Sequence, residues 1–190
     1  MVQVTVPCGL ILRGTVNMKH TRTNGFTLIE MVLYMGIFSL IISSIVGLAM
    51  VATAQRVKSQ VIADVTYQGE ALMSSMTQAV RGASSVTTPA QGTTNATLQL
   101  NTPYAATTPT IYDATTNGGV MRLRLREGVT PTTNYLSNSH VVLSNLSFSN
   151  NGLTNTKGSI KISFTLTYVN PNGRDEYNYS KNFFGGANLP

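Results

Sequence analysis

The chain has few of the residues that cross-link a fold or carry charge. Its 190 residues include one cysteine and no tryptophan, and only 11% of them are charged. The lone cysteine, Cys8, excludes an intrachain disulfide, so a folded domain must hold together by packing alone. The abundant Ser, Thr and Asn residues suit a hydrogen-bonding, extracytoplasmic surface better than a cytosolic enzyme.

One long apolar run dominates the rest of the sequence. It extends from Phe26 to Ala54, and Glu30 is the only charged residue in it. The run exceeds the roughly 20 apolar residues that cross a bilayer as a helix. A charge at mid-membrane costs about 2.5–3.5 kcal/mol even on a lenient insertion scale, so an acid kept there requires a partner.

The residues around the start of this run form a recognisable motif. A basic, polar segment from Lys19 to Gly25 precedes Phe26-Thr27-Leu28-Ile29-Glu30. This arrangement resembles the type IV pilin and type II secretion pseudopilin superfamily, in which a membrane-embedded aspartyl peptidase cuts after the glycine and methylates the new N-terminus. The resemblance implies a cut between Gly25 and Phe26, N-methylation of Phe26, and Glu30 as the fifth residue of the mature chain.

Residues 1–25 are then a leader peptide. Its loss removes Arg13, Lys19 and Arg22 from a total of 13 basic residues, which leaves 10 against 7 acids, a net charge of +3. This balance does not indicate nucleic-acid binding. Met18 is a second candidate start that shortens the leader to the family's usual length, and a genuine long leader is the alternative.

The sequence predicts one helix in two parts. Residues 26–54 are apolar all round, as a transmembrane or filament-core helix requires, and residues 55–82 are amphipathic up to a stop at Gly82. Gly36 and Gly47 permit either local melting or close approach of neighbouring helices. The apolar stripe of the second part recurs at spacings of three and four residues: Val57, Val61, Ile62, Val65, Leu72, Met73, Met76 and Val80.

Residues 83–190 are expected to form an extracytoplasmic head built on an antiparallel β-sheet. Residues 83–95 and 102–117 are predicted to be mainly loop. The predicted strands are Leu98–Leu100, Val120–Arg126, His140–Phe148 with a bulge at Ser144-Asn145, Ile160–Tyr168, and Glu176–Phe184 after a turn at Asn170–Gly173.

The predicted fold class is α+β: a long N-terminal helix, half membrane-spanning and half amphipathic, packed on a small antiparallel sheet, the lollipop of the pilins. The order of elements in residues 60–184 weakly resembles that of J-type minor pseudopilins and minor pilins. That resemblance favours a minor subunit.

Glu30 is predicted to direct assembly. The cut frees an amine at Phe26, and in a packed filament the Glu30 carboxylate of a neighbouring subunit accepts it. A low dielectric strengthens this pair. The helix dipole also favours an acid in the first turn by about 0.3–1 kcal/mol. The alternative is an acid tolerated at the membrane edge.

No catalytic, cofactor-binding or metal-binding constellation is recognisable, so the chain is not expected to be an enzyme or to hold a cofactor. After loss of the leader one histidine, His140, remains, too few for a usual zinc site. Arg122, Arg124 and Arg126 form a basic stripe about 13 Å long. It is interpreted either as the solvated face of a strand, which we favour, or as a contact for a polyanion such as DNA.

The leading hypothesis is therefore a structural subunit of a type IV pilus or a type II secretion pseudopilus. The expected partners are other pilin or pseudopilin subunits, the prepilin peptidase/methyltransferase, an inner-membrane assembly platform and, before assembly, membrane lipid. Nucleic acid is not expected as a partner. The chain would begin in the cytoplasmic membrane with its N-terminus in the cytoplasm and later join a cell-surface or periplasmic filament.

Two other hypotheses stay open. The first is a secreted binding domain behind an ordinary signal sequence cut after Ala54, since Ala52-Thr53-Ala54 fits the small-residue cleavage pattern. The apolar run is about twice the usual 7–15 residues, which argues against this. The second is a single-pass anchored domain that is neither cut nor assembled.

Overall fold

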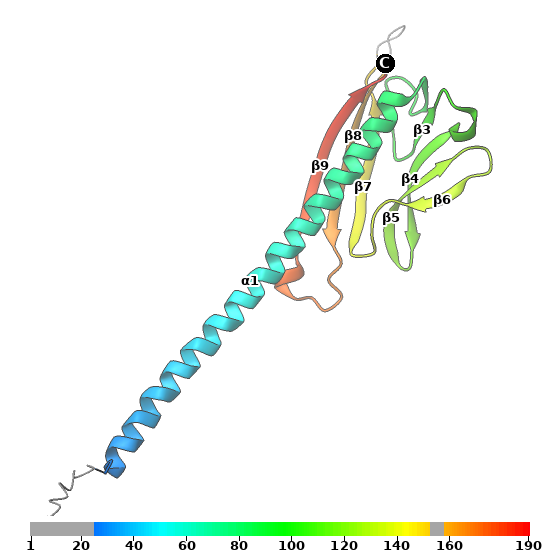
Figure 1. The fold of residues 1–190 in the computed structure, drawn as a ribbon. Helices are drawn as coiled ribbons and strands as arrows, with labels where there is room; N and C mark the ends of the chain where they lie inside the picture. The colour runs from blue at the N-terminus through cyan, green and yellow to red at the C-terminus, as the bar shows by residue number, and fades with distance from the viewer. Residues whose placement is uncertain (1–24, 153–157) are drawn as a thin grey trace, which may run out of the picture. The chain divides into compact units, whose positions relative to one another are not determined.

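The computed structural model describes residues 25–152 and 158–190, so the expectations for residues 1–24, including the start at Met18, lie outside it. One long helix, α1 (Leu28–Gly82), is followed by strands that form two antiparallel sheets (Figure 1). The C-terminal part of α1 shares a hydrophobic core with these strands. The predicted α+β class is confirmed.

The chain divides into two compact units within α1, between Val46 and Gly47. The described part of the first unit consists of residues 25–46, which are helical from Leu28 onward and have no buried side chain. The helix is continuous through Gly36 and Gly47, so local melting is not observed at either glycine.

In the second unit, one face of α1 is buried against the strands. The predicted amphipathic stripe is confirmed for five of its members, whereas Ile62 is 37% exposed and does not belong to it. Gly69 also lies on the buried face, where a Cβ would stand 2.0 Å from the ring of Phe183. The buried apolar side chains of α1 are Val61, Val65, Leu72, Met76 and Val80.

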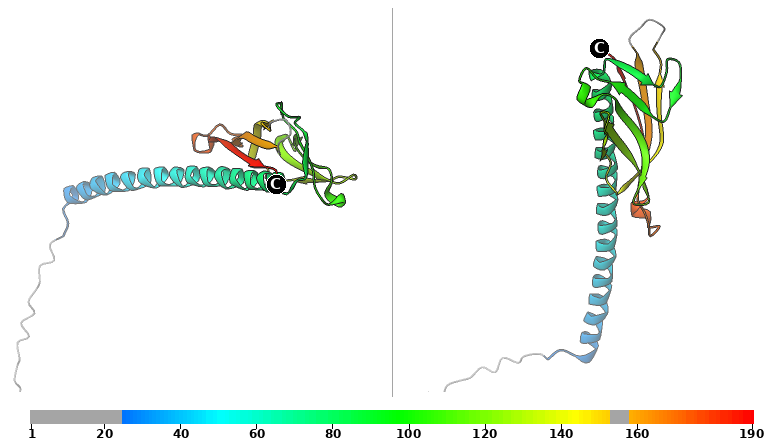
Figure 2. Two further views of the ribbon diagram at one scale, coloured as in Figure 1. Left: turned by 90° about the horizontal axis from the view of Figure 1, so that it is seen from above. Right: turned by 90° about the vertical axis from the view of Figure 1, so that its right-hand side faces the viewer.

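The strands form two sheets, so the prediction of a single small sheet was wrong. The two sheets meet where β5 lies beside β7, and Figure 2 shows them from two further sides. The five-stranded sheet has the order β1 (Ser85–Thr88), β3 (Leu98–Asn101), β4 (Thr110–Asn117), β5 (Val120–Glu127), β6 (Thr132–Tyr135). The four-stranded sheet has the order β2 (Thr94–Asn95), β7 (Val141–Asn150), β8 (Ser159–Tyr168), β9 (Ser180–Asn188).

Strands with clean alternation lie where they were predicted. β5 and β8 match their predicted ranges within one residue, and β7 shifts register between Ser144 and Ser147, as the predicted bulge requires. Asn145, inside this bulge, has a φ of 52°. The predicted turn before β9 is also confirmed by a hydrogen bond from the Gly173 N–H to the Asn170 carbonyl (3.4 Å).

Strands without such alternation were missed. β1 and β2 lie in the predicted loop 83–95, β4 lies in the predicted loop 102–117, and β6 was not expected. These short or Thr-rich segments carry no period-2 apolar pattern, and their pairing with neighbouring strands decides their conformation. β9 begins at Ser180 and not at the predicted Glu176, because a 3₁₀ turn, η2 (Asp175–Tyr177), occupies the residues before it. Another 3₁₀ turn, η1 (Ala105–Thr107), precedes β4.

Candidate functional site

The Gly25–Phe26 peptide bond lies outside the helix. Both residues are in irregular backbone before α1, and apart from its chain neighbours no described residue comes within 4 Å of where a Cβ of Gly25 would stand. The Phe26 side chain is 69% exposed. An exposed, non-helical bond is one that a peptidase can take into an extended binding cleft.

Thr27 caps the start of α1. Its hydroxyl oxygen accepts a hydrogen bond from the Glu30 backbone N–H (3.3 Å), and its carbonyl accepts from the N–H groups of Glu30 (3.1 Å) and Met31 (3.2 Å). This is the Ser/Thr half of a capping box. The capping role of Thr27 was not predicted from the sequence, although the Thr-x-x-Glu spacing indicates it. The cap keeps Gly25 and Phe26 outside the helix.

Tyr34, one turn beyond Glu30, was also missed. Its hydroxyl donates a hydrogen bond to Glu30 Oε1 (3.1 Å), and its ring contacts Phe26 edge-on with centroids 6.2 Å apart. The other carboxylate oxygen, Oε2, has no hydrogen-bond partner among the described residues. Tyr34 therefore holds the carboxylate through one of its two oxygens.

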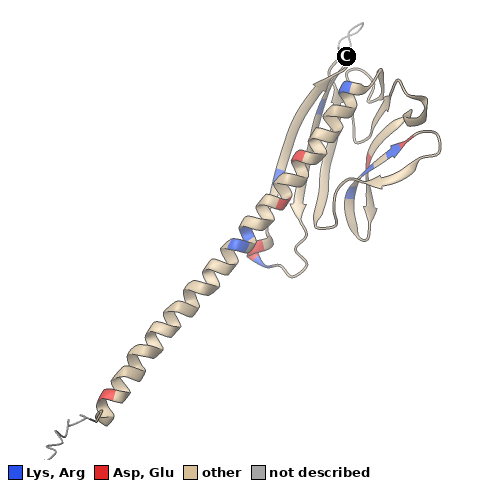
Figure 3. Ribbon diagram, viewed as in Figure 1, with Lys and Arg blue, Asp and Glu red and all other residues tan. Residues whose placement is uncertain are grey.

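The helix beyond Glu30 presents apolar side chains in all directions. No charged residue occurs between Glu30 and Arg56, and this stretch is the long uncharged part of α1 in Figure 3. α1 is long and apolar enough to span a membrane, and no residue of its most apolar stretch is buried. A signal sequence near an N-terminus passes the same test of length and composition.

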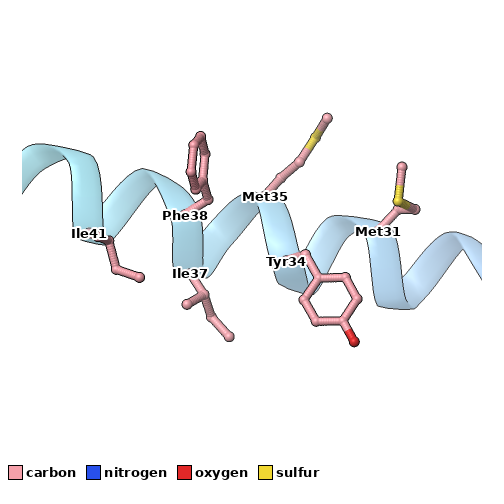
Figure 4. A pocket seen from close by; sticks show the side chains of 6 residues that line it. All are labelled: Met31, Tyr34, Met35, Ile37, Phe38 and Ile41. Atoms are coloured by element: carbon pink, nitrogen blue, oxygen red, sulfur yellow. The ribbon is translucent and has the colours of Figure 1, made fainter.

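Figure 4 shows part of this surface from close by. Met31, Met35 and Phe38 project to one side of the helix, and Tyr34, Ile37 and Ile41 to the other. The hollow between them is formed by the helix itself, with no other element behind it. A continuous exposed apolar surface of this kind requires lipid or another apolar surface to cover it.

The three arginines of β5 do not form a free basic face. Asp113 of β4 accepts hydrogen bonds from Arg124 (2.8 and 2.7 Å) and from Arg126 (2.8 Å). Arg122 donates to the Ser137 carbonyl and lies over the Tyr135 ring, 4.9 Å from its centroid. The favoured interpretation of a solvated face thus needs correction, since these side chains are engaged within the sheet.

Burial by itself raises the pKa of Asp113, but the hydrogen bonds and charges of Arg124 and Arg126 outweigh it and leave the pKa below its usual value. The carboxylate is therefore ionised at neutral pH and balances one of its two arginines. This arrangement locks the register of β4 and β5, where Asp113 and Arg124 are cross-strand partners.

Within residues 25–152 and 158–190, no group of three or more His, Cys, Asp or Glu residues is placed to hold a metal ion. Comparisons with protein-family models, with curated proteins and with solved structures found no match for this chain.

Proposed function

We propose that this chain is a structural subunit of a type IV pilus or a type II secretion pseudopilus. It is cut after Gly25, N-methylated at Phe26, and assembled through the N-terminal part of α1. The order of elements in residues 60–184, which weakly resembles that of minor subunits, favours a minor subunit; counting copies of the chain in purified filaments tests this part.

The observation that carries the proposal is an apolar helix with one acid near its start. Glu30 sits in the first turn of α1, oriented by Tyr34, and the next charge is Arg56. A helix of this composition is stable in lipid, and it is equally suited to packing among sister helices. The exposed Gly25–Phe26 bond before it is the bond at which the motif is cut in the family that the chain resembles.

Assembly then follows from the charges. Before processing, the chain lies in the cytoplasmic membrane with its basic leader in the cytoplasm. Cutting exposes a positively charged amine at Phe26. Once the helix packs against sister helices away from water, this amine and Glu30 of a neighbour neutralise one another, so that neither charge is left alone in an apolar environment. An assembly platform and a motor protein supply the movement.

Intact mass and N-terminal sequencing of the protein recovered from cells with an active prepilin peptidase test the processing step. We expect a chain that begins at Phe26 and carries one extra methyl group. The matched variant Gly25→Val should retain the leader and stay in the membrane fraction. A wild-type chain that begins at Gln55 would establish the secreted domain instead, and an uncut chain would establish the simple anchor.

Substitution of Glu30 tests the assembly step separately. Glu30→Gln removes the charge with little change in volume, and Glu30→Asp keeps the charge. We expect both variants to be cut and methylated, whereas Glu30→Gln should fail to enter filaments sheared from cells. Normal filament incorporation of Glu30→Gln would contradict the proposed pairing.

A further inference from the structure

A hollow of about 520 Å³ lies beside α1 within the second unit. It is open at the surface, and side chains of α1, of the turn just before β7 and of the end of β8 line it. Its lining residues are Gln60, Ala63, Asp64, Tyr67, His140 and Tyr168.

The hollow combines aromatic rings with a single carboxylate. Tyr168 stacks on Tyr177 with centroids 5.9 Å apart and lies 6.3 Å from His140, and Tyr67 is 72% exposed. Asp64 is half-buried and takes part in no ion pair among the described residues. Burial and then the Asp64 charge raise the pKa of Tyr168, as expected when the carboxylate lies near that ring.

These groups select a cation. A carboxylate partly withdrawn from water gains from a hydrogen-bonded ammonium or guanidinium group, and the faces of tyrosine rings attract positive charge. The ligand class that fits the hollow is therefore a lysine or arginine side chain.

The basic residues nearest along α1 cannot fill the hollow of their own chain. Lys58 and Arg56 are exposed and in no ion pair among residues 25–152 and 158–190. Lys58 is six residues before Asp64, which places it about 9 Å away along the axis and about 120° around the helix. Figure 3 shows basic positions in the middle of α1 that are followed by acidic ones toward its C-terminal end.

We propose that the hollow receives Lys58 from a second copy of this chain. The inference rests on the proposed function and requires two copies of this chain side by side with parallel helices. A minor subunit present as a single copy would not provide this arrangement, so the count of copies in purified filaments also tests the inference. Pairing of one copy's Phe26 amine with the other's Glu30 displaces the copies by four residues. Counted along α1, that displacement brings Lys58 of one copy level with residue 62 of the other, about 3 Å along the axis from Asp64. The long Lys58 side chain can span this distance.

Lys58 suits the hollow of a neighbouring copy better than Arg56 does, because it lies on a different side of α1 from the hollow of its own chain. Parallel copies related by a displacement contact one another through different faces, a heterologous contact that continues into a filament. Arg56 lies only about 80° around α1 from Asp64, on the side of the hollow itself, whereas Lys58 lies about 120° away. Glu70, the next acid along α1, is exposed, and at this displacement it lies about 12 Å along the axis from the level that Lys58 of the other copy reaches.

Cysteine cross-linking in assembled filaments tests this contact. The mature chain has no cysteine, since Cys8 is the only one and precedes Gly25, so introduced thiols react alone. We expect Lys58→Cys/Asp64→Cys filaments to give a disulfide-linked dimer or ladder on oxidation. A disulfide within one chain is excluded, because its Cα atoms would be at least about 9 Å apart, beyond the roughly 7 Å limit. Each single variant, and the matched control Lys58→Cys/Glu70→Cys, should remain monomeric.

Charge exchange provides a second measurement that does not depend on thiols. Asp64→Lys should lower filament yield at least tenfold without preventing the cut after Gly25, and Asp64→Lys/Lys58→Asp should restore most of it. Filaments whose cysteines react with maleimide but do not cross-link, together with no rescue by the exchange, would overturn the contact and leave the proposed function intact. If the wild-type chain is never cut at Gly25, the proposed function and this inference fail together.

Discussion

Replacement of Gly69 by alanine tests how α1 is seated on the four-stranded sheet. A Cβ at this position would stand 2.0, 2.3 and 2.4 Å from three carbon atoms of the Phe183 ring. Phe164 of the neighbouring strand stacks against this ring with centroids 5.2 Å apart, which restricts its movement. Helix and strand must therefore separate locally, or Phe183 must leave its rotamer.

The expected loss is the difference between two effects. Overpacking of this kind costs about 1–3 kcal/mol, and more where backbone must move. Alanine returns about 1 kcal/mol of helix propensity relative to glycine. Because the added Cβ would stand only 2.0 Å from the Phe183 ring, the upper part of that range, about 2–3 kcal/mol, applies. The net destabilisation is then about 1–2 kcal/mol, or a fall in Tm of roughly 2–8 °C for a chain of this size.

Thermal and urea unfolding in detergent micelles, followed by circular dichroism and tyrosine fluorescence, measures this loss. The double variant Gly69→Ala/Phe183→Leu should show a smaller loss than the two single changes added together, because both act on one contact. Gly47→Ala is the matched control and should not destabilise the protein, because among the described residues only the surrounding backbone of α1 itself lies near the added Cβ. A Gly69→Ala protein as stable as wild type would refute the close helix–strand contact.

Three further predictions concern single side chains. Folding lowers the pKa of Asp113, so the carboxylate stabilises the folded protein above its unfolded pKa of about 3.9. This stabilisation is lost as the pH falls through the folded pKa. Unfolding measured as a function of pH should show the loss in wild type and not in Asp113→Asn. Met76→Ala should cost about 2–5 kcal/mol in urea unfolding, and Ile62→Ala, at an exposed site, much less. Thr27→Ala should remove about 0.5–2 kcal/mol from the first turn of α1, seen as faster amide exchange at Glu30 and Met31, and Thr27→Ser should not.

Local sequence patterns predicted the elements whose signal lies within one segment. The apolar run, the amphipathic stripe with Val65 and Met76, and the stop at Gly82 determine α1, because helical periodicity and breakers act over a few residues. Clean alternation likewise located β5 and β8. The motif from Gly25 to Glu30 was readable for the same reason, and so was the Thr27 cap, although that signal was overlooked.

Pairing between distant segments could not be predicted in this way. β1, β2 and β6 have little apolar alternation of their own, and they are strands because neighbouring strands supply their hydrogen bonds. The division into two sheets follows from which strands become neighbours, a choice that no single segment encodes.

The sequence by itself thus determined where the helix runs, where the only charge of its apolar run lies, and where the motif from Gly25 to Glu30 stands, because each depends on residues adjacent along the chain. Only the tertiary structure decided that Asp113 binds both Arg124 and Arg126, that Phe183 packs against Gly69, and that Asp64 lies beside a cluster of aromatic rings. These contacts join residues far apart in the sequence, and their energies depend on the register and burial that packing alone establishes.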